Sequence, residues 1–282
     1  MRPRAFCLIR QEPHYRRDAF VTGLRACGLD VTVGSVARNI GPQDVVVVWN
    51  RYGIAESAAL QGERVGAAVI IAENGYIGAV EDAYRKPYAS PDMRPETQLY
   101  ALALNHHNGA GRWWIGEPGR WRAQGVRVSP WRTTGEHVLI LPQRGIGPVG
   151  VAMPKDWPQK ALERLRTMTR RPVRIRSHPG NAPAERPLKA DLDGAWCVMT
   201  WGSGGGIKAL VAGVPVCCDW PKWIGYHAAA PIWRIETPIC DDAARDRMLD
   251  CLAWAQHEVR EISTGEPLHR LIELHRAKAL AA

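Results

Sequence analysis

The segment from Ala195 to Asp219 constrains the fold more than any other part of this sequence. It reads AWCVMTWGSGGGIKALVAGVPVCCD. The apolar runs Ala195 to Thr200 and Val214 to Cys218 predict two buried strands, and Ile207 to Ala212 between them predicts a helix. Strand, turn, helix and strand in this order form the βαβ unit of a parallel sheet.

A glycine-rich turn, Trp201 to Gly206, leads into that helix. The first N–H groups of a helix lack intrahelical acceptors, and the helix dipole makes this end positive. Glycine carries no side chain that would keep a ligand away from the backbone. We therefore expect a pyrophosphate to bind at Ser203, Gly204 and Gly205. The alternative is a purely structural turn, although three consecutive glycines lose considerable conformational entropy on folding.

The chain has 282 residues, of which 46% are hydrophobic, enough for two small domains with their own cores. No apolar run is long enough to span a bilayer, and the N-terminus lacks a signal-peptide cleavage site, so we expect a cytoplasmic protein without a membrane partner. Seven cysteines without a C-x-x-C pair predict buried free thiols rather than a zinc site.

A net charge of +9 favours a polyanionic partner such as nucleic acid or a phosphorylated substrate, unless it reflects a basic proteome background. Basic and aromatic residues interleave between residues 112 and 122, a composition suited to nucleic-acid contact. The alternative is a surface helix whose tryptophans pack inward. The candidate DNA-binding residues are Arg112, Trp113, Trp114, Arg120 and Arg122.

Strands and helices alternate at short intervals through the first third of the chain, which predicts a parallel sheet with helices on both faces. The predicted strands are Ala5–Ile9, Asp30–Val33, Asp44–Trp49 and Ala67–Ala72, and the predicted helices are His14–Cys27 and Gly53–Arg64. Two polar segments are expected at loops that line a ligand site. They are Glu73 to Tyr76 and Asn105 to Gly109.

A second α/β segment begins with the predicted strand His137–Pro142, followed by a glycine loop, and includes a strand that ends at Arg176. Trp233–Ile235 is predicted as a last short strand and Asp242–Ile262 as one long helix. We expect an acceptor domain over residues 1–132, a nucleotide-sugar domain over 133–262, and a C-terminal helix over 263–282 that packs back toward the first domain.

Two runs carry a resemblance to a known class of enzymes. Ala209 to Val216 (ALVAGVPV) and the turn Arg176 to Pro179 (RSHP) resemble motifs of GT-B glycosyltransferases, and the resemblance extends over residues 137–220. It implies an α/β fold with two Rossmann-like domains facing each other across a cleft. It also implies a nucleotide-sugar co-substrate, with a UDP-sugar expected, no permanently bound cofactor and no required metal.

Short runs elsewhere are similar to bacteriophage proteins grouped with DNA-modifying glycosyltransferases. They are Glu73–Tyr76, Leu104–Gly109, Gly202–Leu210 and Glu261–Glu266. This similarity implies sugar transfer to the hydroxymethyl group of a modified pyrimidine in double-stranded DNA. Two alternatives stay open: a transferase acting on a cell-surface polymer or small acceptor, as the RSHP turn suggests, and a non-catalytic nucleotide- or DNA-binding module.

Within the expected donor site, further candidates for contacting the phosphates or the base are Arg144, Gly145, His178 and Lys208. Lys208 departs from the GT-B pattern, since many members carry there a glutamate that binds the ribose. A lysine on the first turn of the helix would instead suit phosphate. His178 is alternatively a packed loop residue.

The acceptor hydroxyl must lose its proton during transfer, and the first domain offers candidate bases. Glu73 is the first choice because a carboxylate at the end of a buried strand is partly desolvated, which favours proton uptake. Its alternative role is to cap the following turn. His106 and His107 are the second choice, and Asp82 and Asp92 follow.

Overall fold

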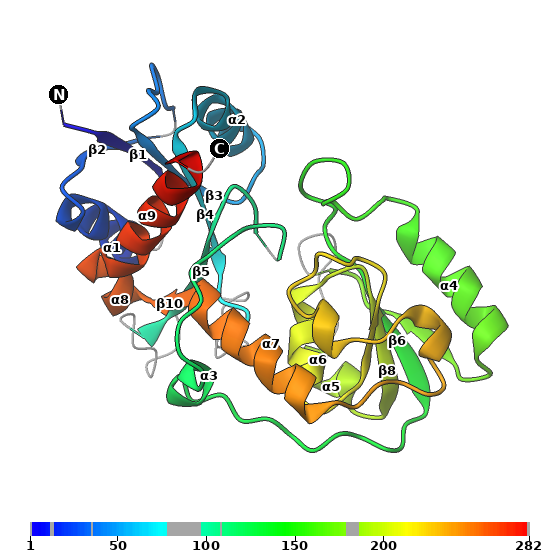
Figure 1. The fold of residues 1–282 in the computed structure, drawn as a ribbon. Coiled ribbons are helices and arrows are strands. Elements are labelled where there is room, and N and C mark those ends of the chain that lie inside the picture. The colour runs from blue at the N-terminus through cyan, green and yellow to red at the C-terminus, as the bar shows by residue number, and fades with distance from the viewer. Residues whose placement is uncertain are drawn as a thin grey trace. The chain divides into compact units, whose positions relative to one another are not determined.

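The computed structural model describes residues 2–11, 14–34, 36–77, 97–107, 109–178 and 186–280. It divides into two compact units. The first comprises residues 1–107, 111–117 and 253–282, and the second comprises 108–110 and 118–252. The second unit is thus inserted into the first, and the chain returns to the first unit at residue 253 instead of 263. Both units are α/β, as the sequence predicts (Figure 1).

The first unit contains a six-stranded sheet with the order β10-β5-β4-β3-β1-β2. Its strands are β1 (Arg4–Leu8), β2 (Asp30–Val33), β3 (Val45–Trp49), β4 (Ala68–Asn74), β5 (Leu99–Leu104) and β10 (Gln256–Glu258). Strands β1 to β4 are parallel, whereas β5 is antiparallel to β4 and β10 is antiparallel to β5. The valine run of β3 is buried, as expected for a central parallel strand covered on both faces.

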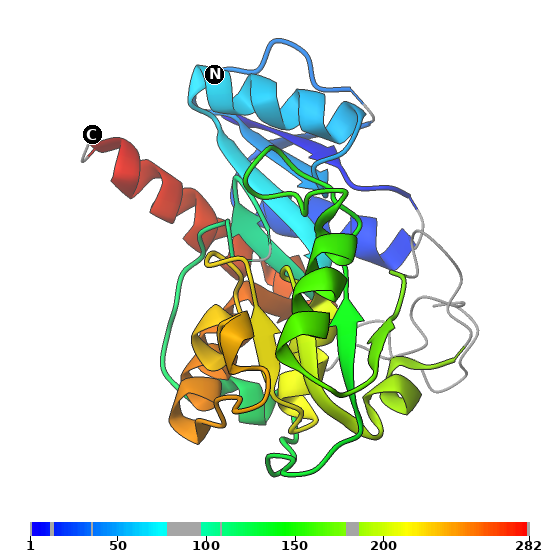
Figure 2. The same cartoon turned by 90° about the vertical axis from the view of Figure 1, so that its right-hand side faces the viewer.

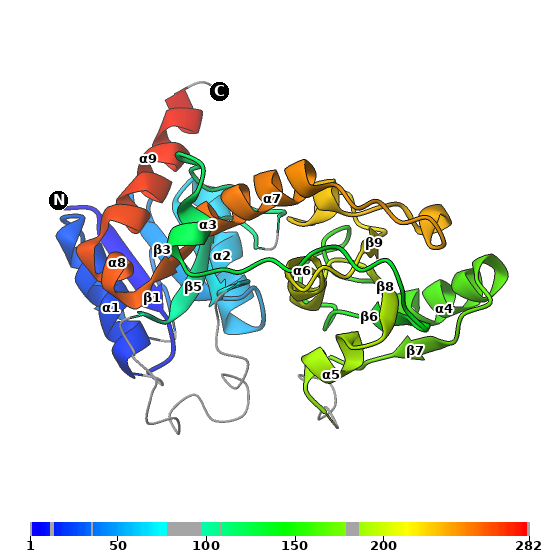
Figure 3. The same ribbon diagram turned by 90° about the horizontal axis from the view of Figure 1, so that it is seen from below.

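Helices cover both faces of this sheet (Figures 1 and 3). They are α1 (His14–Ala26), α2 (Ile54–Val65), α8 (Val259–Thr264) and α9 (Glu266–Leu280). On one face, Phe20 of α1 and Ile262 of α8 pack with Ile70 of β4. On the other face, Ala59 of α2 packs against Val46 of β3. The C-terminal helices therefore form part of the first core.

The predicted single helix from Asp242 to Ile262 is wrong. The structure has α7 (Asp242–Ala255), then strand β10, then α8. Strand β10 forms because β5 offers a free edge, with Gln256 opposite Ala101. The buried Gln256 side chain also accepts N–H bonds from Tyr76 and Ile77 at 2.9 and 3.1 Å. These long-range contacts override the local helical pattern.

The second unit contains a four-stranded parallel sheet with the order β7-β6-β8-β9. Its elements are α3 (Arg120–Ala123), β6 (His137–Leu141), α4 (Trp157–Met168), β7 (Val173–Ile175), α5 (Leu188–Leu192), β8 (Ala195–Thr200), α6 (Gly204–Val211), β9 (Val216–Cys218), two 3₁₀ turns η3 (Tyr226–Ala228) and η4 (Ile232–Arg234), and most of α7. Helix α4 covers one face of this sheet through Trp157 and Leu165, and lies in front of the strands in Figure 2.

Two local predictions for this unit are corrected. The expected strand Trp233–Ile235 is the 3₁₀ turn η4. The expected glycine turn is shorter, because α6 begins at Gly204 and includes three of the glycines in its first turn. Among the described residues, no helix combines the length and the apolar composition that crossing a membrane requires.

Candidate active site

The carboxyl edge of the second sheet gathers the candidate donor residues. Because β6 to β9 are parallel, the loops that follow them leave the same edge. Arg144 follows β6, His178 follows β7 and Ser203 follows β8. The side chain of Gln143 donates a hydrogen bond to the carbonyl of Gly202, which ties the first of these loops to the third.

Thr200, the last residue of β8, organises the start of α6. Its buried hydroxyl donates to the carbonyl of Leu141 at 2.8 Å and accepts the N–H groups of Gly202 and Ser203 at 3.1 and 2.8 Å. Ser203 is the N-cap of α6, and its hydroxyl accepts the N–H of Gly205 at 3.2 Å. Sequence reasoning missed Thr200, which reads as an ordinary strand residue.

Gly204 differs from the other glycines of the run in its hydrogen bonding. The N–H of Gly206 donates to the carbonyl of Ser203 at 2.9 Å, so four of the five N–H groups from 202 to 206 have acceptors in the protein. Within the described residues, the Gly204 N–H has no acceptor. The sequence predicts several available amides at this helix start, and the structure reduces them to one.

Gly204 also differs in its packing. A Cβ atom at Gly206 would lie 2.8 Å from Cη2 of Trp223, and one at Gly202 would lie 2.8 Å from Cε3 of Trp220. Gly204 is exposed, has no left-handed φ, and has no atom within 4 Å of its Cβ position. Packing therefore requires glycine at 202 and 206 but leaves the backbone at 204 open to a ligand.

His178 and Arg144 lie close enough to interact. Burial of His178 lowers the pKa of its imidazole, and the positive charge of Arg144 lowers it further. Arg144 is exposed, and the following Gly145 adopts a left-handed φ of 71°. An arginine and a neutral imidazole at the carboxyl edge of a parallel sheet are suitable donors and acceptors for a phosphorylated nucleoside.

Lys208 lies four residues after Gly204 in α6 and is half-buried. Residues four apart share one face of a helix, so Lys208 and the open Gly204 backbone lie on the same side of α6. This placement is compatible with the expected phosphate contact, which stays a prediction.

Glu73, the first candidate base, is the penultimate residue of β4 and lies opposite Ala101 of β5. Its Oε2 atom is buried and has no hydrogen-bond partner among the described residues. Buried polar atoms are nearly always paired, and an exception requires a reason such as a catalytic role. A proton-accepting role would supply that reason.

His106 and His107 are the second pair of candidate bases. They follow β5, which is antiparallel to β4, and the N–H of Asn105 donates to the carbonyl of Val69 at 2.8 Å. The sequence treats Glu73 and the histidines as alternatives for one task, and the antiparallel direction of β5 places Asn105, the residue before the histidines, next to Val69 near the start of β4. His107 and Ala101, the residue opposite Glu73, line the same tightly packed site, and the Nδ1 atom of His107 is buried without a hydrogen-bond partner among the described residues.

The predicted DNA-binding segment is divided between the two units. Arg112 and Trp113 belong to the first unit, where Arg112 bridges to Leu104 and Trp113 packs against the core. Trp114 is 40% exposed, and the guanidinium of Arg270 lies 4.2 Å from its ring centroid. Of these two indoles, Trp114 retains the exposure that stacking on a base needs.

The part of this segment in the second unit includes the short helix α3. Trp121 is buried, and the guanidinium of Arg122 lies 4.1 Å from its ring centroid and pairs with Asp246 at 2.9 Å. Arg120 is the first residue of α3. The alternative prediction is a surface helix whose tryptophans pack inward. Trp121 does pack inward, but the helix covers only four residues of the segment.

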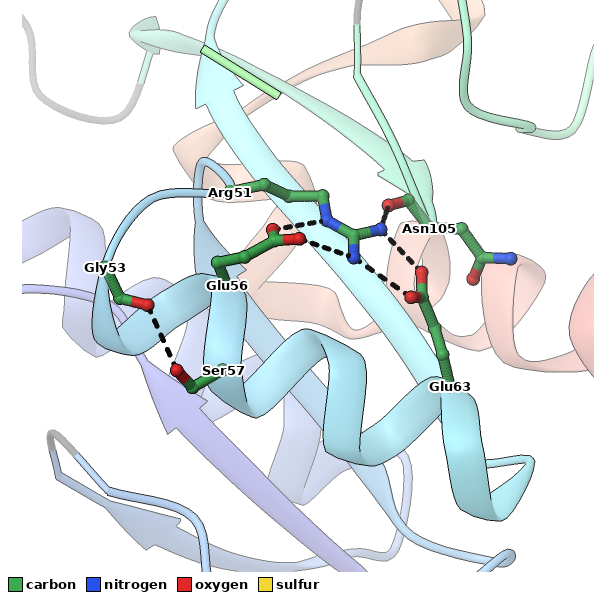
Figure 4. Close-up of polar contacts among 6 residues, drawn as sticks. All are labelled: Arg51, Gly53, Glu56, Ser57, Glu63 and Asn105. Atoms are coloured by element: carbon green, nitrogen blue, oxygen red, sulfur yellow. Dashed lines mark hydrogen bonds and ion pairs between the residues drawn. The ribbon is translucent and has the colours of Figure 1, made fainter. Parts of the chain in front are cut away.

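Two weaker base candidates, Asp82 and Asp92, lie outside the described residues. Within the described part of the chain, no three His, Cys, Asp or Glu side chains are grouped as metal ligands. A cluster that the sequence did not reveal surrounds Arg51, which contacts Glu56, Glu63 and the turn before His106 (Figure 4).

No model of a protein family matches the sequence, and no curated protein matches it. Two solved structures from Thermosulfurimonas dismutans are similar: KpsC, beta Kdo 2,4 transferase, and KpsC, beta Kdo 2,7 transferase. The first has 12% identity and a TM-score of 0.55, covering 89% of this chain and 90% of that chain. The second has 14% identity and a TM-score of 0.55, covering 97% and 99%. This chain therefore has the fold of these two transferases, and the predicted GT-B-like fold class is confirmed.

Proposed function

We propose that this protein is a glycosyltransferase that binds the diphosphate of a nucleotide-sugar donor, a UDP-sugar, at the start of α6. The proposal rests on one observation at Gly204. Its backbone is accessible to a ligand, and its N–H has no acceptor among the described residues. The fold shared with two transferases supports the reaction class.

The reaction breaks the bond between the anomeric carbon and the phosphate oxygen and joins that carbon to the acceptor oxygen. The leaving diphosphate gains negative charge, which donors at the helix start stabilise. The Gly204 N–H, the ammonium of Lys208 on the same helix face and the guanidinium of Arg144 are the proposed donors. The proton of the acceptor hydroxyl passes to a base, for which Glu73 and His106 are the candidates.

Substitution of Gly204 by alanine tests the donor site. A methyl group there blocks the approach to the backbone, so we expect UDP and UDP-sugar binding to weaken at least about tenfold, or about 1.4 kcal/mol. Gly34→Ala is the matched control, because Gly34 also has no atom within 4 Å of its Cβ position and no left-handed φ. Calorimetric titration that gives equal affinities for Gly204→Ala and wild type would exclude this site.

For the acceptor, we propose the hydroxymethyl group of a modified pyrimidine in double-stranded DNA. The net charge of +9, Arg112 and the exposed Trp114 support this choice. The protein is incubated with hydroxymethylated or unmodified duplex and a panel of nucleotide sugars, and the digested nucleosides are weighed. A hexose mass on the modified base alone is the expected result, and no mass gain with any donor argues against DNA.

A saccharide of a surface polymer is the second candidate acceptor. The likeness to two Kdo transferases favours it. In this case, sugar is transferred to an oligosaccharide, and DNA binding is salt-labile and insensitive to base modification. Tight nucleotide binding without transfer or donor hydrolysis, across donors and both acceptor classes, would instead identify a non-catalytic binding module.

A further inference from the structure

Arg51 lies after β3 and uses its whole guanidinium group in contacts within the first unit (Figure 4). It donates to both carboxylate oxygens of Glu56, at 2.7 and 3.2 Å, and to both of Glu63, at 2.5 and 2.9 Å. A fifth bond of 2.6 Å reaches the carbonyl of Asn105. These bonds match the five N–H donors of an arginine, whose side chain here is 2% exposed.

The turn at Asn105 needs such support. Asn105 has a φ of 67°, and the N–H of His106 bonds across it to the carbonyl of Leu104 at 2.8 Å. A three-residue turn with this positive φ is rare and strained, and a strained turn persists when its surroundings hold it in place. Arg51 holds the carbonyl of Asn105, and the carbonyl of Val69 holds its N–H.

We propose that Arg51 is a positioning residue for His106: through the Asn105 carbonyl it fixes the turn that presents this imidazole as the proton acceptor. The inference rests on the proposed function and selects His106 over Glu73 as the base. It assigns a role to the Arg51–Glu56–Glu63 cluster, which contacts the turn through the carbonyl of Asn105.

The charges around His106 suit a base. Burial lowers the pKa of His106, and the charge of Arg51 lowers it further, with a smaller contribution from His107 on the same loop. The carboxylates of Glu63 and Glu56 on α2 act in the opposite direction. The imidazole therefore stays neutral to a lower pH than an ordinary histidine, and a neutral ring nitrogen is what accepts a proton.

Two variants should move the acidic limb of the pH profile of kcat/KM in opposite directions. Arg51→Met removes the positive charge and leaves both carboxylates, so the limb should shift to higher pH. Glu63→Gln removes one carboxylate and keeps Arg51, so the limb should shift to lower pH. Arg51→Lys keeps the charge but cannot make five bonds, so kcat should fall at least about tenfold with little shift of the limb.

Arg4→Met is the matched control. Arg4 also bonds a carboxylate, Asp44, and the carbonyl of an asparagine with a positive φ, Asn39 at 54°. The residue that follows is Ile40 rather than a histidine. This variant should lose stability without any shift of the limb.

Proton NMR titration of His106 gives a readout that does not depend on activity. Absence of transfer by the wild type would overturn the proposed function, while opposite shifts of the His106 resonance in Arg51→Met and Glu63→Gln would still support the electrostatic role. A His106→Ala variant with wild-type kcat, or a limb and resonance that stay unmoved in both variants, would overturn the inference. If Arg51→Met does not fold, Glu63→Gln alone decides the direction.

Discussion

The indole ring of Trp223 packs against the backbone of Gly206, so that a Cβ there would lie 2.8 Å from Cη2 of the ring. Trp223 is 2% exposed and cannot yield without disturbing the loop after β9. We expect Gly206→Ala to lower the free energy of unfolding by about 1–3 kcal/mol. Gly204→Ala, where the space is open, should change it little or raise it by about 0.4–1 kcal/mol. Urea denaturation of both variants checks the contrast.

Thr200 provides a second test of the start of α6. Thr200→Val keeps the shape but removes one donor and one acceptor, which leaves two N–H groups and a carbonyl without their partner. We expect the free energy of unfolding to fall by about 1–3 kcal/mol and donor binding to weaken. Thr200→Ser keeps the hydroxyl and should retain most of both. Equal stability of the valine variant and wild type would contradict this role.

Stability should decrease as the pH falls below about 6.5. Burial is the largest cause that lowers the pKa of His106, His137 and His178 from the ordinary value of 6.5. The unfolded chain therefore binds protons at a higher pH than the folded chain. The free energy of unfolding has its full value above about pH 6.5 and decreases as the pH falls below it. Urea denaturation between about pH 7.5 and 5.5 measures this, and a flat profile would contradict it.

Thiol reactivity should be confined to few positions. All seven cysteines are free, as the sequence predicts, and Cys7, Cys197, Cys217 and Cys218 are buried. The predicted burial is wrong for the exposed Cys240 and for Cys27 and Cys251, which are half-buried. Burial raises the pKa of Cys7 to about 11 and that of Cys218 to about 12, which suppresses the reactive thiolate. Cys240 is exposed, so it should react first with an aromatic disulfide, and Cys240→Ser should remove this fast phase.

The βαβ unit from β8 to β9 could be predicted from the sequence because one local pattern specifies it. Buried strands, a glycine-rich start and a helix of two turns all lie within 25 consecutive residues, Ala195 to Asp219. The donor candidates follow from the same logic, since parallel strands bring the loops after them to one edge. Periodicity and turn residues are sufficient to predict a structural unit when the contacts that determine it are local in sequence.

The first unit shows where this reasoning fails. Strand β10 exists because β5 provides an edge more than 150 residues away in the chain, and a helical pattern before and after it conceals that pairing. The antiparallel direction of β5 also depends on tertiary pairing. Arg51 gives no local signal, because its partners Glu63 and Asn105 become neighbours only in the folded sheet.

The insertion of the second unit between β5 and β10 has a consequence for synthesis. The ribosome completes the second unit before it delivers Ile262, Leu268 and Leu271, which fill the first core. Until α8 and α9 emerge, the apolar face of β1, β3 and β4 therefore has α1 as its cover but lacks the two C-terminal helices. Such delayed long-range pairing slows folding and leaves apolar surface exposed, which promotes aggregation. Truncation before residue 253 should thus yield a chain that aggregates, even though it contains every candidate donor and acid–base residue.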